Sequence, residues 1–125
     1  MLVSYYQIEK FVDIFNKIGD KPLKGTAAFA LAKIFSEVTT YYLDYGRKRT
    51  ELVEEFCKRD EDGKAIKDED GGLVIKKERL DEFLNRMSQL YSETVEISDV
   101  RLSVEDISDV ELTGRELYDI MVFFK

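Results

Sequence analysis

Apolar residues recur at steps of three and four near the start of the chain, which is the spacing of one buried face of an α-helix. This stripe consists of Ile8, Phe11, Phe15 and Ile18. Ser4 followed three residues later by Gln7 is a capping-box pattern, and Gly19 supplies a stop. The pattern therefore predicts a helix from about Tyr5 to Ile18.

The most regular pattern is a heptad of apolar positions with one polar member. Its positions are Leu31, Phe35, Val38, Tyr42, Tyr45, Arg49, Leu52 and Phe56. It predicts a helix from Leu23 to Arg59 that only Gly46 interrupts. Such a helix is about 55 Å long, whereas a globule of this chain length is only about 36 Å across. The helix is therefore expected either to bend at Gly46 or to extend and pack against a partner.

This mismatch predicts self-association through the second helix. Aromatic side chains with a polar tip are favoured at protein interfaces, and a polar residue on a helical seam can set the register of pairing. The contact residues that this hypothesis selects are Phe35, Tyr42, Tyr45 and Arg49. The alternative, equally compatible with the sequence, is that the tyrosine rings belong to the core of the chain itself.

The remaining patterns predict a small β element and two further helices. Lys64–Lys67 and Leu73–Lys76 read as strands of a hairpin, followed by a helix from about Lys77 to Ser92 that packs antiparallel on the long helix. Alternating positions between Val95 and Val104 indicate one or two strands, and Thr113 with Glu116 opens a short C-terminal helix.

The expected fold class is α+β, mostly α, in a single domain over residues 1–125. Its helical part covers about 4–92 and an acidic strand-plus-helix part covers about 93–125. No internal repeat is expected, and no apolar run is long enough to span a membrane.

Composition narrows the chemistry that the chain can perform. The 125 residues carry a formal charge of −7, with one cysteine and no histidine. Histidine-based catalysis and most transition-metal sites are thereby excluded, and the spacing of Asp60/Asp62 and Asp68/Asp70 does not fit a calcium-binding EF-hand loop. We therefore expect no enzyme activity, no cofactor, no metal and no small-molecule substrate, and regard the acidic pairs as a solvated turn.

The last third of the chain carries most of the negative charge. Seven acidic residues and one basic residue lie between Glu93 and Thr113. The most concentrated part of this face comprises Glu105, Asp106, Asp109 and Glu111. Such a face repels nucleic acid, so none is expected as a partner, but it could mimic DNA and inhibit a basic, nucleic-acid-handling host protein. The simpler interpretation is a charged edge that keeps the protein soluble.

Short sequence words and their order also resemble a protein family. They are AAFALAKIF at the start of the long helix, the KRDEDGK turn, the VEI strand and the DISDVEL stretch. From about Gly25 onward the chain resembles small, uncharacterised proteins of tailed bacteriophages, although the terminal GRELYDIMVFFK departs in detail. The resemblance implies a minor virion or assembly protein, made in the cytoplasm of a bacterial host, whose partners are further copies of itself or other phage proteins.

Overall fold

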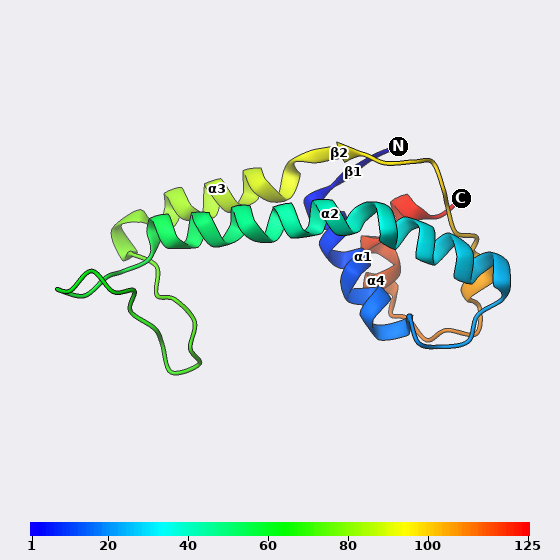
Figure 1. Cartoon of the computed structure of the whole chain (residues 1–125), viewed down its shortest axis with the longest axis horizontal. Coiled ribbons are helices and arrows are strands. Elements are labelled where there is room, and N and C mark those ends of the chain that lie inside the picture. Colours follow the sequence, from blue (N-terminus) through cyan, green and yellow to red (C-terminus); the bar gives the residue numbers. More distant parts are fainter. The chain divides into compact units, whose positions relative to one another are not determined.

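The computed structural model describes all 125 residues, which group into two compact units. The first unit comprises Met1–Leu43 together with Glu93–Lys125, and the second comprises Asp44–Ser92. The longest helix, α2 (Gly25–Phe56), contributes to both units (Figure 1). The fold is α+β and mostly α, as predicted, and its contacts group into these two units.

The first unit begins with a strand that leads directly into a helix. Strand β1 (Leu2–Ser4) pairs antiparallel with β2 (Thr94–Glu96), with Val3 opposite Val95. Helix α1 (Tyr5–Ile18) has the predicted capping box, in which the Ser4 side chain accepts from the Gln7 backbone N–H. The pairing of β1 with β2 thus fixes where α1 starts.

The core of the first unit forms around α1. The Phe11 ring lies 4.7 Å from that of Phe123, and Phe15 stacks on Phe35 of α2 with centroids 3.9 Å apart. The short helix α4 (Gly114–Asp119) also packs on α1, and the Lys17 ammonium lies 3.0 Å from the Glu116 carboxylate. The C-terminal third is therefore part of the same core as the N-terminal helix.

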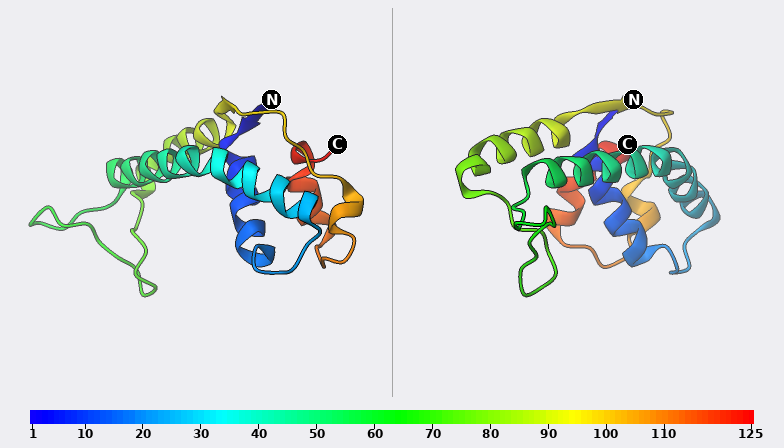
Figure 2. Two further views of the ribbon diagram at one scale, coloured as in Figure 1. Left: turned by 45° about the vertical axis from the view of Figure 1, so that its right-hand side comes forward. Right: turned by 60° about the vertical axis from the view of Figure 1, so that its left-hand side comes forward.

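The second unit pairs the later part of α2 with α3 (Leu80–Ser92), which follows a 3₁₀ turn. Tyr45 contacts Tyr91 and Phe56 contacts Phe83, so the two helices run antiparallel, as predicted. Figure 2 shows this pair from two sides. The hydrogen-bonded helix continues through Gly46 without interruption.

Two hairpins follow α2, although the sequence patterning predicted only the second. They arise from an eight-residue repeat, Cys57–Lys64 and Ala65–Gly72, in which the word DEDG recurs. In each repeat the aspartate Oδ1 (Asp60, Asp68) accepts two backbone N–H groups, and the following glycine has a φ near +80°. The expectation of no internal repeat is thus wrong. The repeat unit of eight residues is shorter than the repeats that build separate structural modules, so a pattern search at that larger scale does not reveal it. We call residues 57–76 the double hairpin.

The two hairpins share one hydrogen-bonded base. The backbone N–H of Lys58 donates to Val74, that of Ile66 donates to Lys58, and that of Val74 donates to Ile66. These three residues are spaced by eight, so the repeat places equivalent positions around one ring of hydrogen bonds. The base is consequently ordered although no continuous strand forms there.

One of the one or two strands expected between Val95 and Val104 forms as β2, but the segment after β2 does not form a second strand. Only Leu102 forms a further bridge, to Phe124, and residues 104–107 form a 3₁₀ turn. The reason is local: the carboxylate of Asp106 accepts from the backbone N–H and hydroxyl of Ser103, which closes a turn in place of a strand.

Candidate functional site

The structure places most of the predicted contact residues toward the interior of their own unit. Tyr45 is only 3% exposed and lies against Tyr91. Phe35 is half-buried on Phe15, Tyr42 is half-buried, and Arg49 is exposed. The heptad is therefore the inner face of α2, and its apolar positions are largely covered by the chain itself.

Exposed apolar side chains of α2 lie on the opposite side of the helix. Phe29 is 70% exposed and Leu43 is 66% exposed. At 100° per residue, the exposed positions between them fall on the same side of the helix. This surface, here called the outer face, consists of Ala28, Phe29, Ala32, Lys33, Ser36, Thr40 and Leu43.

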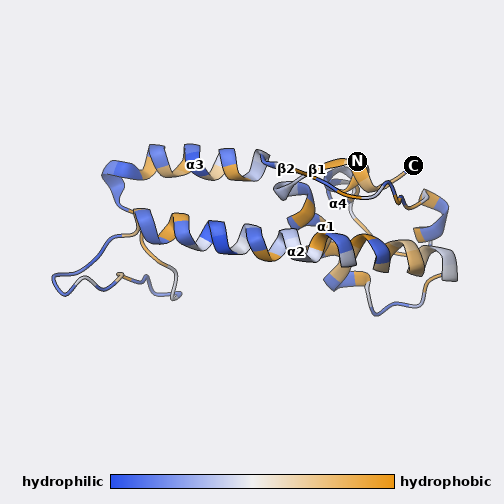
Figure 3. Cartoon of the chain, turned by 45° about the horizontal axis from the view of Figure 1, so that its top comes forward, coloured by the Kyte–Doolittle hydropathy of each residue, from blue (hydrophilic) through white to orange (hydrophobic).

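The outer face is poor in charge, although 36% of the residues in the chain are charged. Only Lys33 and Glu37 are ionisable between Gly25 and Leu43, apart from two tyrosines. Figure 3 accordingly shows more orange and pale ribbon in the first half of α2 than in the second. The four small residues at steps of four, Ala28, Ala32, Ser36 and Thr40, would allow another helix to approach closely.

Glu37 is engaged within the first unit. Its carboxylate accepts from both the backbone N–H and the hydroxyl of Ser98. The Ser98 hydroxyl bond is the main reason why the pKa of Glu37 lies below its usual value, since it favours the charged form. Glu37 therefore fixes the segment after β2 on α2, and Lys33 is the one charged side chain on the outer face.

The double hairpin is the most strongly charged element of the second unit. Its six carboxylates lie at the two turns and belong to Asp60, Glu61, Asp62, Asp68, Glu69 and Asp70. Arg59 and Lys64 flank the first turn, and Lys67 precedes the second. Each turn presents three consecutive acidic residues, and we call these two groups the acidic tips.

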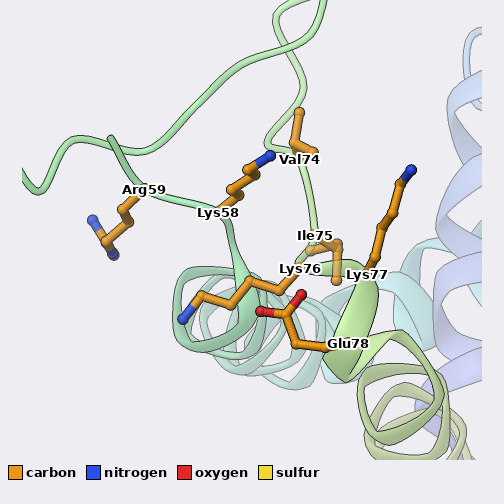
Figure 4. Close-up of a pocket in the computed structure, with 7 residues that line it drawn as sticks. All are labelled: Lys58, Arg59, Val74, Ile75, Lys76, Lys77 and Glu78. Atoms are coloured by element: carbon orange, nitrogen blue, oxygen red, sulfur yellow. The ribbon is translucent and has the colours of Figure 1, made fainter. Parts of the chain in front are cut away.

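A groove lies where the double hairpin joins the helices (Figure 4). Its volume is about 400 Å³, which is within the range of small ligand sites. Lys58 and Lys77 stand on either side of Val74 and Ile75, and Glu78 is the one carboxylate in the lining. We call it the root groove.

The predicted acidic face of the last third is only partly available. Glu105, Asp109 and Glu111 are exposed, whereas the carboxylate of Asp106 is used in the Ser103 turn. Glu105 also borders an apolar cavity of about 340 Å³. The apolar lining of this cavity comprises Val104, Ile107, Val110, Leu112 and Leu117.

Neither a metal centre nor a membrane helix is found among the 125 described residues. No group of three carboxylate or cysteine side chains is placed to hold a metal ion, and the single cysteine, Cys57, is buried at the base of the double hairpin. None of the helices combines the length and the apolar character needed to cross a bilayer.

Comparisons with known protein families, with curated proteins and with solved structures yield no match. The resemblance to tailed-phage proteins therefore stays a prediction from short sequence words.

Proposed function

We propose that this chain is a non-enzymatic interaction protein that self-associates through the outer face of α2. The observation that carries this proposal is the exposure of Phe29 and Leu43 at the two ends of a charge-poor helix face. Large exposed apolar side chains on such a face are typical of protein–protein contact sites. The second helix thus remains the contact element that the sequence suggested, but the face differs.

The spacing on the outer face favours a second copy as the partner. Phe29 and Leu43 lie seven residues on either side of Ser36, about 21 Å apart along the helix. In an antiparallel pair with its two-fold axis beside Ser36, Phe29 of each copy meets Leu43 of the other. Ala32 then faces Thr40, and the small side chains let the backbones approach. A face that is complementary to itself in this way fits a closed two-fold dimer.

The biological setting follows from the resemblance in the sequence. We infer a minor virion or assembly component of a tailed phage, made in the host bacterial cytoplasm, with other phage proteins as further partners. Copurification with intact particles supports this role. Its complete absence from particles and from assembly intermediates would contradict it.

Sedimentation velocity over a dilution series tests self-association directly. At about 0.5 M salt, where charge contacts are screened, the protein should sediment as a dimer at high concentration and as a monomer on dilution. A protein that stays monomeric at millimolar concentration would refute the proposal. Phe29→Ala should shift the equilibrium toward monomer, while Leu84→Ala, an equally simple truncation of an exposed side chain on α3, should not.

The acidic segment favours a second candidate function. Glu105 borders an apolar cavity, and Asp109 and Glu111 are exposed in the same segment, an arrangement that suits a basic and partly apolar segment of a host protein. The chain would then inhibit a nucleic-acid-handling or defence protein by occupying its DNA-binding surface. Capture of such a protein from host lysate, lost when these three residues are neutralised, would favour this function. Capture that is unchanged by neutralisation would exclude it.

A further inference from the structure

The double hairpin separates its charges along its length. Six carboxylates lie at the acidic tips, and an equal number of cations lie beside the turns and at the root. These cations are Lys58, Arg59, Lys64, Lys67, Lys76 and Lys77. No ion pair joins a tip carboxylate to any of them within the chain. Lys77 directly follows the double hairpin, so residues 57–76 themselves carry five cations and six carboxylates, a net charge of −1, with the carboxylates gathered at the tips and Lys58, Lys76 and Lys77 at the root.

The acidic tips are fixed in shape rather than loose. Asp60 and Asp68 hold their turns through backbone N–H groups 2.9–3.0 Å from Oδ1. Gly63 and Gly71 adopt the left-handed backbone that closes such turns. The other four carboxylates, Glu61, Asp62, Glu69 and Asp70, make no hydrogen bond or ion pair and face solvent. Each tip thus presents two free carboxylates in a constrained geometry.

The root groove is complementary to such a tip. Lys58, Lys76 and Lys77 have no carboxylate partner in the chain, and their ammonium groups remain available. Arg59 is held in place because its guanidinium donates to the carbonyls of Gly63 and Glu54. Four cations against the single carboxylate of Glu78 give the groove a net positive charge.

We propose that an acidic tip of one copy docks into the root groove of a second copy. Because the free carboxylates of the tip and the lysines of the root groove are different surfaces, this contact is heterologous: the tip of each copy is available to another while its own groove is occupied. The eight-residue repeat supplies two equivalent tips for each groove, which raises the chance of productive encounter. Opposite charges of this density also steer association.

This inference rests on the proposed self-association in that the partner is again a second copy, but it uses a separate surface. The outer face of α2 is charge-poor, so its contact should persist in salt. The tip-and-groove contact depends on charge and should weaken by on the order of tenfold or more between 0.05 and 0.5 M salt. The two contacts can therefore be distinguished by ionic strength alone.

A charge exchange between two full-length variants provides the test, in a Phe29→Ala background that removes the outer-face contact. The tip variant carries Glu61→Lys, Asp62→Lys, Glu69→Lys and Asp70→Lys, and keeps both turn-forming aspartates. The root variant carries Lys58→Glu, Lys76→Glu and Lys77→Glu. At 0.05 M salt, sedimentation should show that each variant alone loses association, and that mixing them restores it through the lysine tips and the glutamate groove.

A control variant with Glu105→Lys and Asp109→Lys changes charge outside the double hairpin and should associate as its parent does. The inference is overturned if mixing restores nothing. It is also overturned if the tip variant associates like its parent while the root variant does not, because the groove then takes some other anion. Neither result bears on the outer face, which is tested by Phe29→Ala at 0.5 M salt.

Discussion

Truncation of Phe29 is the perturbation whose effect follows most directly from the structure. Moving a phenylalanine side chain from water to a fully buried site contributes a favourable free energy of about 1.5–3 kcal/mol. Phe29 is 70% exposed in one copy, so its burial in a dimer would contribute about 1–2 kcal/mol. Two copies of the contact form in each two-fold dimer. Phe29→Ala should therefore raise the dimer dissociation constant by about 30- to 700-fold, at 1.4 kcal/mol per factor of ten.

The same substitution should leave the fold intact. Phe29 makes no contribution to the buried core, and alanine is the better helix former, so the free energy of unfolding should change by less than about 0.5 kcal/mol. Thermal unfolding followed by circular dichroism checks this. A loss of dimer without a loss of stability identifies a surface contact rather than a core residue.

The pairing of Phe29 with Leu43 across the dimer adds a stricter requirement. If the two side chains meet, Phe29→Ala and Leu43→Ala should be non-additive in the dissociation constant, as a double-mutant cycle measures. A dissociation constant for Phe29→Ala within about threefold of the parent value, measured at 0.5 M salt, would refute the reasoning about the outer face.

Four further substitutions test the structure itself. Gly63→Ala should destabilise the second unit by about 1–2 kcal/mol, because φ is +79° there and alanine is strained in that region, and urea unfolding that shows no loss would contradict the turn geometry. Gly46→Ala should instead raise the free energy of unfolding by about 0.5–1 kcal/mol in the same assay, since Gly46 lies within a helix and has open space around it. Tyr45→Ala should cost about 3–5 kcal/mol of stability, as expected of a buried ring; a change confined to association would restore the original interface hypothesis. Glu116 has a pKa below its usual value of 4.5, because the Thr113 backbone N–H and, to a smaller extent, the Lys17 ammonium donate hydrogen bonds to its carboxylate. Its contribution is present above pH 4.5 and is lost as pH falls through the lowered pKa, so Glu116→Gln should make the loss of stability between pH 5 and 3 shallower.

Local patterns in the sequence predicted local structure well. The capping boxes at Ser4 and Thr113 both form, and α1 has the predicted bounds. These elements depend on contacts between residues three or four positions apart, and the spacing of residues in the sequence is enough to predict such contacts. The antiparallel packing of α2 and α3 was also predictable, because a short connecting element between two amphipathic helices makes them neighbours.

The candidate sites were harder to predict because they depend on which partners cover a face. The heptad correctly identified an apolar stripe on α2, but the sequence did not show that Phe15 and Tyr91 cover it at Phe35 and Tyr45. The heptad does not select Phe29, because Phe29 lies off that stripe. Its position among small uncharged residues was the available signal.

The repeat in the double hairpin was visible in the printed sequence as two copies of DEDG eight residues apart. Apolar patterning alone does not predict the first hairpin, because charged residues flank its turn and no alternating apolar strand precedes it. The three-way backbone pairing joins Ile66 and Val74 to Lys58, which lies in a charged segment without an apolar run. Only the structure shows that the repeat positions equivalent residues around one base.

Cross-linking at the expected two-fold axis tests the central claim most directly. In the antiparallel pair, Ser36 of one copy faces Ser36 of the other, and close helix packing brings their Cα atoms within disulfide range. Mild oxidation of Ser36→Cys should give a covalent dimer at low micromolar concentration, whereas Arg49→Cys, also exposed on α2 but outside the outer face, should not. Equal cross-linking at both positions, or none at Ser36→Cys, would contradict self-association through the outer face of α2.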